Sequence, residues 1–341
     1  MTQSVGATPS DPVSAINASV IIINWNGQPH LARCLEALAV QTYRDFEIIV
    51  VDNGSTDGSV AFIRENHPRV RLIENDRNLG FAVPNNQAIR IARGRYIVTL
   101  NNDTRPPPDW LGALVQAADG HPEIGAFASL VVFDDQRSII DSAGLSVTLA
   151  GMGCQRRMGQ MVDQVHGPEE VFGACAAAAL YRRELLDDVG LFDEDYFAYY
   201  EDVDLAWRAR LRGWRAVLVP QALVYHAHSA TGGRGSSFKR RLIARNKLWT
   251  IVKNYPFPAW LVCLPLILAY NIGAVLLPLV QGDPSSWVGT WEGIRQLRQV
   301  LVKRATIQST RQVPFRQLMP WMGCFGRPLA GWLARRKVGR L

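Results

Sequence analysis

Three apolar segments that each end in Asn or Asp constrain the fold of this chain more than any other feature. They are ASVIIINWN (18–26), FEIIVVDN (46–53) and YIVTLNND (96–103). Runs of this length that are rich in Val and Ile predict buried β-strands. An Asx turn would explain one such ending. Three on one edge of one sheet favour a ligand site, because ligands of open α/β sheets gather at the carboxyl ends of the strands.

Amphipathic segments separate these predicted strands. Residues 30–42, 59–67 and 85–94 have the apolar spacing or the stop signals of helices. Strands that alternate with helices predict an α/β fold with a mixed, mostly parallel sheet flanked by helices. Neither G-x-G-x-x-G after the first strand nor G-x-x-x-x-G-K-[ST] occurs in the sequence. A Rossmann dinucleotide site and a P-loop are therefore unsupported. Further strands are expected at 70–75, 124–133, 173–182 and 214–228.

A dense group of carboxylates interleaved with aromatic residues follows between positions 192 and 204. Acids in the first turn of a helix interact favourably with the helix dipole, which explains one or two of them. Acids held against aromatic rings have raised pKa values, as a general base requires. Arg208 and Arg210, on the same predicted helix, are expected to be solvated charges rather than phosphate ligands. The acids are Asp193, Glu194, Asp195, Glu201, Asp202 and Asp204.

The net charge of +7 is unevenly distributed, with −13 over residues 1–204 and +20 over residues 205–341. A basic half of this kind binds nucleic acid or an anionic membrane surface. No nucleic-acid-binding motif accompanies the charge, so no nucleic acid is expected as a partner. Residues 254–282 carry no charge, and 260–280 are long enough to span a bilayer.

Prolines 256, 258, 265 and 278 argue against a straight spanning helix in this apolar stretch. An in-plane or membrane-embedded segment is favoured. A true span and a buried or dimer-forming helix, which would make a homodimer through the C-terminal region, remain alternatives. Tryptophans 287, 291, 321 and 332 suit a headgroup interface.

The cysteines and the N-terminus indicate the compartment. The five cysteines are far apart and form no CxxC or Cys/His cluster, which predicts reduced thiols and no zinc site. Residues 1–17 are polar and small, so they are expected to be a disordered tail and not a secretory signal. The expected location is the cytoplasmic face of the cell membrane, as a peripheral or monotopic protein.

Six motifs occur in the order and spacing of family 2 glycosyltransferases with the GT-A fold, which the chain resembles over about residues 18–255. The later segment ARNKLWTIVKNYP, with the apolar stretch after it, resembles rhamnosyltransferase-like members that act on lipid-linked glycans. The resemblance implies a GT-A domain at 18–255 and a C-terminal helical membrane-associating extension at 256–341. The motifs are SVIIINWN, VVDNGSTDGS, NLGFAVPNN, TLNNDTRPPPDWL, YYEDVDLAWRARLRGW and VYHAH.

The resemblance also implies roles for residues that bind the donor and the acceptor. Asp52 matches the acid that accepts the N3–H of uracil or thymine, as charge-assisted hydrogen bonds allow. Asn24 and Asn26 match the segment that lines the nucleoside pocket. Asn78 and Asn85 match the donor-side loop. Two further implied substrate contacts are Asn102 and Cys175, the latter in the acceptor-facing loop.

The metal and the catalytic base are implied in the same way. Asp103 matches the last Asp of the D-x-D motif, which binds Mg²⁺ or Mn²⁺ across the donor diphosphate. Asn101 replaces the first Asp, so either the metal is held more weakly or Asn101 contacts the ribose. His226 matches the histidine that completes the metal shell. Asp202 matches the catalytic base, and its neighbour Glu201 is the alternative.

The implied activity is inverting transfer of a sugar such as rhamnose from a UDP- or dTDP-sugar to a lipid-linked glycan acceptor in cell-envelope polysaccharide synthesis. A sugar-nucleotide pyrophosphorylase is an alternative, but INWNGQPHL lacks the Gly-rich basic loop with which such enzymes open. A catalytically inactive nucleotide-sugar-binding membrane protein is the second alternative. The presence of Asp103 and of the Glu201–Asp202 pair argues against it.

Overall fold

The computed structural model describes residues 16–227 and 236–323. The expected tail at 1–17 therefore lies outside the described residues except for its last two positions. Trp332 also lies outside them.

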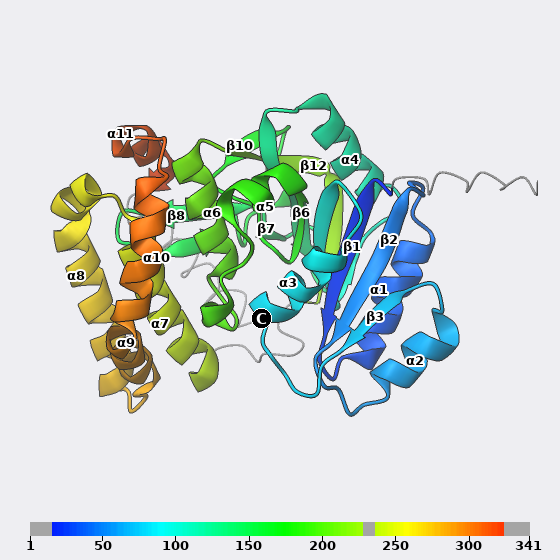
Figure 1. Ribbon diagram of the computed structural model, residues 1–341, viewed down its shortest axis with the longest axis horizontal. Helices are drawn as coiled ribbons and strands as arrows, with labels where there is room; N and C mark the ends of the chain where they lie inside the picture. The colour runs from blue at the N-terminus through cyan, green and yellow to red at the C-terminus, as the bar shows by residue number, and fades with distance from the viewer. Residues whose placement is uncertain (1–15, 228–235, 324–341) are drawn as a thin grey trace, which may run out of the picture.

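A large mixed sheet forms the centre of the molecule (Figure 1). Its strand order is β10-β12-β6-β11-β4-β1-β2-β3, and β5 and β7 pair with β12 and β6. β11 and β10 run antiparallel to their neighbours, whereas β1 to β4, β6 and β12 are parallel to one another. The strands are β1 (Ala18–Asn24), β2 (Phe46–Asp52), β3 (Arg71–Glu74), β4 (Tyr96–Asn101), β5 (Thr104–Arg105), β6 (Ile124–Phe133), β7 (Ile140–Ser142), β10 (Glu169–Val171), β11 (Ala178–Arg182) and β12 (Arg215–His226).

Helices cover both faces of this sheet because the strands alternate their apolar side chains between the two faces. Val20 and Ile22 of β1 face a core with α1, α2 and α4, whereas Ile21 faces a second core with α3, α5 and α6. The predicted α/β class is confirmed. The helices are α1 (Gln28–Ala39), α2 (Ser59–Asn66), α3 (Ala82–Ile91), α4 (Trp110–Gly120), α5 (Arg183–Val189) and α6 (Glu201–Arg212).

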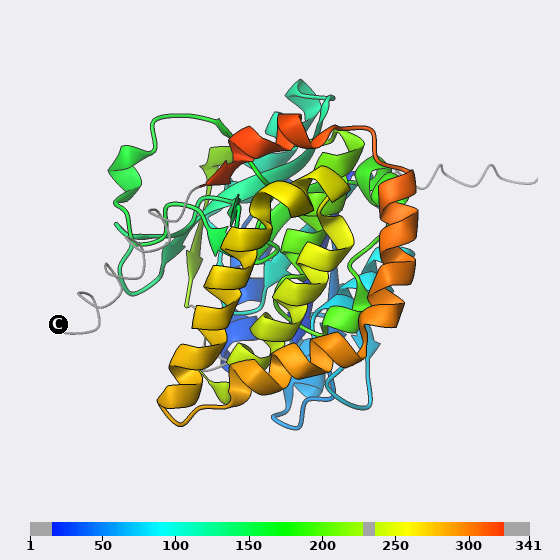
Figure 2. The same ribbon diagram turned by 90° about the vertical axis from the view of Figure 1, so that its left-hand side faces the viewer.

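The C-terminal part adds a further helical layer against α6 (Figure 2). Leu205 and Ala209 of α6 face the sheet, whereas Val203 and Trp207 face this layer. α6 is therefore buried on two sides. The layer consists of α7 (Ser237–Asn254), α8 (Phe257–Val280), α9 (Ser285–Arg295), α10 (Leu297–Ser309) and α11 (Phe315–Leu318). Small elements complete the described chain: β8 (Leu145–Thr148), β9 (Gly153–Gln155), β13 (Met322–Gly323), η1 (Val162–Gln164), η2 (Glu194–Tyr196) and η3 (Met319–Trp321).

The helix α8 has a narrow buried face and a wide exposed apolar one. Ala259, Cys263 and Ile267, at intervals of four residues, are its buried positions. The helix continues through Pro265 and Pro278, so these prolines do not end it. Only 11% of its most apolar 18-residue window is buried. Residues 16–227 and 236–323 therefore leave most of this helix uncovered, and its length and hydropathy suit a membrane span. Its exposed residues include Leu261, Val262, Leu268, Ile272, Leu276, Leu277 and Val280.

Candidate active site

The predicted polar strand endings lie on one edge of the sheet. Asn24 is directly opposite Asp52 in the parallel pair of β1 and β2. Asn101 is opposite Ile23 in the pair of β1 and β4. Because these strands are parallel neighbours, their carboxyl ends open on the same side of the molecule.

A buried hydrogen-bond network joins three of the predicted residues. Asn24 Nδ2 donates to Asp52 Oδ2 over 3.0 Å, and Asn24 Oδ1 accepts from Asn102 Nδ2 over 2.8 Å. The second oxygen of Asp52 accepts the Ser55 backbone N–H over 2.8 Å. Gly27 permits this approach, since a Cβ there would collide with the Asn102 amide. The network holds the Asp52 carboxylate in one orientation at the strand edge.

Asn26 and Asn78 organise the loops around this network. Asn26 Oδ1 accepts the Thr56 backbone N–H over 2.8 Å, and Asn26 has a positive φ of 48°. Asn78 Oδ1 accepts from Asn53 Nδ2 over 3.2 Å and from the Gly80 backbone N–H over 2.8 Å. Both amides therefore hold backbone in place at this edge.

Asn85 has an unused acceptor. It lies in α3, is 1% exposed, and donates through Nδ2 to the Phe81 carbonyl over 2.8 Å. Its Oδ1 is buried, and no hydrogen-bond donor among the described residues contacts it. A buried acceptor without a donor is costly, so Asn85 is poised to accept a hydrogen bond from a bound group.

Asp103, His226 and Asp141 form a line at the junction of β4, β12 and β7. His226 Nε2 lies 3.1 Å from Asp103 Oδ1, and His226 Nδ1 lies 2.7 Å from Asp141 Oδ2. Burial lowers the pKa of His226, but its hydrogen bonds to the two carboxylates outweigh burial and raise that pKa to about 10. Burial raises the pKa of Asp103, while the contact with His226 lowers it to a net value below its ordinary range.

This line contains one carboxylate and one imidazole, side-chain types that ligate divalent cations. Within residues 16–227 and 236–323, no group of three or more His, Cys, Asp or Glu side chains is arranged as a complete metal site. Mg²⁺ is commonly held by one or two carboxylates together with substrate phosphates and water. Asp103 and His226 fit a metal that shares its shell with a diphosphate. Asp141 would orient His226, as outer carboxylates do for metal-bound histidines.

A backbone bridge connects this region to the Glu201–Asp202 pair. The Asn101 N–H donates to the Ala177 carbonyl over 2.9 Å, and the neighbouring Ala176 N–H donates to Asp202 Oδ2 over 3.3 Å. The segment that carries Asp103 and the helix that carries Asp202 are therefore held by the same short loop. The Cys175 thiol in this loop also hydrogen-bonds to Asp202, and burial raises the thiol pKa.

Glu201 and Asp202 open α6 in different environments. Burial and the charge of Asp202 raise the pKa of Glu201 well above its ordinary value, and no donor among the described residues contacts Glu201 Oε2. Burial also raises the pKa of Asp202, but hydrogen bonds from Ala176 and Val203 backbone N–H groups oppose this. Asp202 is therefore the more readily ionised acid of the pair.

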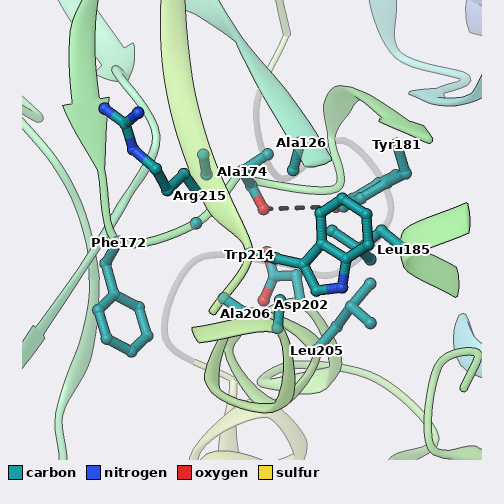
Figure 3. A pocket seen from close by; sticks show the side chains of 13 residues that line it. Ala126, Phe172, Ala174, Tyr181, Leu185, Asp202, Leu205, Ala206, Trp214 and Arg215 are labelled. Carbon is teal, nitrogen blue, oxygen red and sulfur yellow. Dashed lines mark hydrogen bonds between the residues drawn. The ribbon is translucent and has the colours of Figure 1, made fainter. Parts of the chain in front are cut away.

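A small cavity lies beside Asp202, between α6 and the sheet (Figure 3). Its volume of about 10 Å³ suits a single water molecule, and apolar side chains such as Leu205 and Trp214 line most of it. The Tyr181 hydroxyl donates to the Ala174 carbonyl at its wall, over 3.4 Å. This cavity is too small for a sugar, and its apolar lining contributes to the burial that raises the pKa of Asp202.

The backbone before Asp202 is strained. Phe197, Tyr199 and Tyr200 have φ values of 63°, 68° and 74°, a region that bulky residues rarely adopt. Asn246 of α7 donates from its amide to the carbonyls of Ala198 and Tyr199 over 2.9 and 2.7 Å. The C-terminal layer thereby holds the entry to α6.

Buried ion pairs reinforce this contact between α6 and α7. Lys253, 1% exposed, lies 2.5 Å from Asp193 and 2.8 Å from Asp204. Arg208 pairs with Asp204 over 2.9 Å, and Arg210 pairs with Glu170 over 2.7 Å. The prediction of solvated charges at Arg208 and Arg210 is wrong, because both side chains are buried and bonded.

Two residues of this region have partners that no sequence motif reveals. Asp141 lies in IIDSAG, which matches no motif, and only the fold brings it to His226. Lys253 lies 49 residues after Asp204, and only the fold brings the two together. Lys253 and Asn246 both lie within ARNKLWTIVKNYP, so this motif marks the segment but not the contacts that its residues make.

Comparison with known proteins decides the family. The profile of glycosyl transferase family 2 matches residues 19–190, which contain the Asp52 and Asp103 strand ends. The chain belongs to this family. This family 2 glycosyltransferase is 31% identical over 238 residues to an N-acetylglucosaminyl-diphospho-decaprenol L-rhamnosyltransferase of Mycobacterium tuberculosis, a match covering 63% of this chain and 77% of the relative. A second relative is the O-antigen biosynthesis protein RfbC of Myxococcus xanthus, 29% identical over 64% of this chain and 18% of that protein.

Solved structures agree on the fold of this glycosyltransferase. The mannosyltransferase PcManGT from Pyrobaculum calidifontis, solved with GDP-Man and Mn²⁺, has a TM-score of 0.53 at 21% identity, covering 88% of this chain and 87% of that one. GalNAc-T7, solved with UDP, GalNAc and Mn²⁺, has a TM-score of 0.57 at 17% identity, covering 71% and 48%. The predicted family and the predicted GT-A fold are confirmed.

Proposed function

We propose that this glycosyltransferase is inverting and metal-dependent, and that it transfers a sugar such as L-rhamnose from a UDP- or dTDP-sugar to a lipid-linked saccharide. The observation that carries the proposal is the loop at Ala176–Ala177. This loop hydrogen-bonds both to the segment that carries Asp103 and to Asp202. Asp103 would be the acid that binds the cation, and Asp202 would be the ionisable base.

The donor would bind at the strand edge. Asp52, held by Asn24 and Ser55, would accept the N3–H of the pyrimidine. Asn26 and Asn78 would shape the loops around the nucleoside. Asn85, with its unused buried acceptor, would take a hydroxyl of the sugar or ribose, and Asn101 or Asn102 would contact the ribose.

Mg²⁺ or Mn²⁺ would be held by Asp103, by His226 and by the donor diphosphate. A bound cation of this kind stabilises the negative charge that develops on the leaving diphosphate. The single carboxylate is consistent with Asn101 in place of the usual first acid, and Asp141 would keep the imidazole of His226 in position.

Asp202 would act as the general base. It would take the proton of an acceptor hydroxyl while that oxygen attacks C1 of the sugar from the face opposite the leaving nucleoside diphosphate. The C1–O bond to the diphosphate breaks as the new glycosidic bond forms, which inverts C1. Glu201, which holds its proton more tightly, would remain neutral beside it. Cys175 would lie on the acceptor side of Asp202.

The acceptor and the location follow from the C-terminal half. The name of the M. tuberculosis relative describes a rhamnosyltransferase for N-acetylglucosaminyl-diphospho-decaprenol, which is a lipid-linked sugar. The exposed apolar face of α8 and the excess of basic residues after position 204 would hold the enzyme on an anionic membrane at its cytoplasmic face. In this organisation residues 18–255 form the catalytic domain and 256–341 the membrane-associating region. A homodimer through the same face is the competing use of α8.

A transfer assay tests the proposal. Purified protein with Mn²⁺ is incubated with UDP- and dTDP-sugars and with a short-chain prenyl-diphospho-N-acetylglucosamine. Mass spectrometry identifies the products, and NMR gives their C1 configuration. One donor should give a product that gains a single sugar with inverted C1, and EDTA should abolish it. Retention of C1 configuration, or full activity in EDTA, would contradict the mechanism.

A further inference from the structure

Lys247 is a buried lysine that the proposed chemistry does not use. It lies on α7, is 6% exposed, and faces the ring of Tyr270 on α8, with Nζ 4.7 Å from the ring centroid. Among residues 16–227 and 236–323, no carboxylate and no hydrogen-bond acceptor contacts Lys247 Nζ. Lys253, on the same helix, instead forms ion pairs with two carboxylates. Burying an ammonium group without a counter-charge is costly, so the arrangement calls for an anion.

The surroundings of Lys247 connect it to the acceptor side of the site. Burial and the nearby Cys154, Tyr270 and Asp202 groups raise the pKa of Tyr200. The Tyr200 hydroxyl accepts the Gly153 backbone N–H over 3.1 Å. Tyr200 therefore lies close to both Asp202 and Tyr270, and Tyr270 lies against Lys247.

The position of Lys247 also indicates what kind of anion it meets. The nucleotide end of the donor is assigned to the strand edge at Asp52 and Asp103, on the opposite side of α6 from α7. Lys247 instead faces α8, whose outer surface is apolar and includes Leu268 and Ile272. An anion that carries an apolar chain would suit this position, because the chain would lie against these exposed side chains. Burial lowers the pKa of Lys247 to about 8, and a bound anion would hold the ammonium charged.

We infer that Lys247, with Tyr270 beside it, binds the diphosphate that joins the acceptor saccharide to its prenyl chain. The saccharide would then extend past Tyr200 to Asp202, and the prenyl chain would extend along α8. This inference rests on the proposed function for the identity of the acceptor, but it makes a separate statement about where the enzyme binds a diphosphate.

Direct binding of geranyl diphosphate tests the inference without requiring turnover. Calorimetry would compare the wild type with Lys247→Met, Lys247→Arg and Arg298→Met, the last a control that removes an exposed positive charge from α10. Lys247→Met should lose about tenfold to a hundredfold in affinity, the range for a charge-assisted contact. Lys247→Arg should keep the affinity within about threefold of the wild type, and Arg298→Met should leave it unchanged.

A second arm uses dTDP with Mn²⁺ to distinguish the two sources of a diphosphate. All variants should bind dTDP as the wild type does, and the melting temperature of Lys247→Met should be no lower, because the change removes a buried charge. Equal affinity of wild type and Lys247→Met for geranyl diphosphate would overturn the inference and leave Lys247 a packing residue. Loss of dTDP binding in Lys247→Met would overturn it too, by placing Lys247 at the donor. If the wild type transfers sugar but Lys247→Met binds geranyl diphosphate as the wild type does, only this inference is wrong.

If geranyl diphosphate binding depends on Lys247 but the wild type transfers no sugar, only the proposed function is wrong.

Discussion

At the scale of single residues, Asp141 shows how a site depends on a side chain that need not touch the ligand. It bonds to His226 Nδ1 and fixes which nitrogen faces Asp103. Outer carboxylates of this kind typically contribute about tenfold to a hundredfold in metal affinity.

Asp141→Asn should therefore weaken Mn²⁺-dependent binding of a nucleoside diphosphate by about tenfold or more. Calorimetry with and without Mn²⁺ measures the effect. Asp134→Asn is the matched control, because Asp134 is a more exposed acid that pairs with Arg105 and Arg137. Equal losses in the two variants would mean that Asp141 does not act through His226.

The raised pKa of Glu201 predicts how the stability of the protein depends on pH. Its folded pKa is raised above the ordinary 4.5 by burial and by Asp202. Above pH 4.5 the folded state therefore holds a proton that the unfolded state has released, so the contribution of Glu201 to stability falls as pH rises. Glu201→Gln should melt like the wild type near pH 4.5 and above it at pH 7 to 8. Thermal melts across this range measure the difference, and a constant offset at all pH values would contradict the shifted pKa.

The sequence predicts the position of single site residues only where the same kind of side chain recurs at corresponding positions, as at the ends of parallel strands. The strand endings at Asn24, Asp52 and Asn101 were predictable, because parallel strands bring matched ends together. Asp141 and Lys253 were not, because their partners are 85 and 49 or more residues away and only packing joins them. The burial of Arg208 was missed since its partners are mainly backbone carbonyls at 189–191, which no pattern of side chains reveals.

At the scale of elements, α7 holds α6, the helix that carries Asp202, in place. Asn246 bonds to the strained loop before α6, and Lys253 neutralises two acids that α6 and its entry loop bury. The position of Asp202 thus depends on a helix that the family profile, which ends at residue 190, does not include.

Lys253→Met and Lys303→Met provide a matched comparison, since both lysines pair with Asp193. Lys253→Met should lower the free energy of unfolding by about 3–5 kcal/mol, because it removes the buried ammonium group that pairs with both Asp193 and Asp204. The Lys303 side chain is 38% exposed, so its loss should cost about 1 kcal/mol or less. Urea unfolding measures both, and equal losses would show that the buried pair is no stronger than the exposed one.

The sequence predicted which segments form helices more reliably than it predicted how each helix behaves in the fold. The periodicity of 30–42 gave the helix Gln28–Ala39, and the acids at 201–204 marked the start of α6. The continuity of α8 through Pro265 was not expected, because proline removes a backbone hydrogen bond and usually breaks a helix. On an exposed helix face, that missing hydrogen bond is tolerated.

At the scale of the whole molecule, the exposed large apolar side chains gather on the C-terminal layer. Few of them lie on the GT-A part, whereas α8 alone exposes a face along its full length. Exposed apolar surfaces of this extent mark interaction sites, and the basic residues of this half match an anionic surface.

Leu261→Glu with Leu276→Glu should release the protein from vesicles that contain anionic lipid, lowering the bound fraction at least tenfold. These side chains are 71% and 50% exposed, so folding should not suffer. Val40→Glu, at a 56% exposed apolar position of the GT-A part, is the control and should leave binding intact. Sedimentation with vesicles measures the bound fraction. If the double variant stays on vesicles but changes its sedimentation coefficient in solution, α8 is an interface between copies instead.

We propose Asp202 as the general base of the sugar transfer, with the donor nucleotide held by Asp52 and Asp103, and Asp202→Asn separates these two roles. The exchange keeps the shape and one of the two backbone hydrogen bonds, which now come from Ala176 to Oδ2 and from Val203 to Oδ1, but removes the proton acceptor. A single-turnover assay, run beside calorimetry of the donor with Mn²⁺, should show at least a hundredfold loss of the transfer rate, with donor affinity within about threefold of the wild type. A transfer rate within a few fold of the wild type would contradict the account.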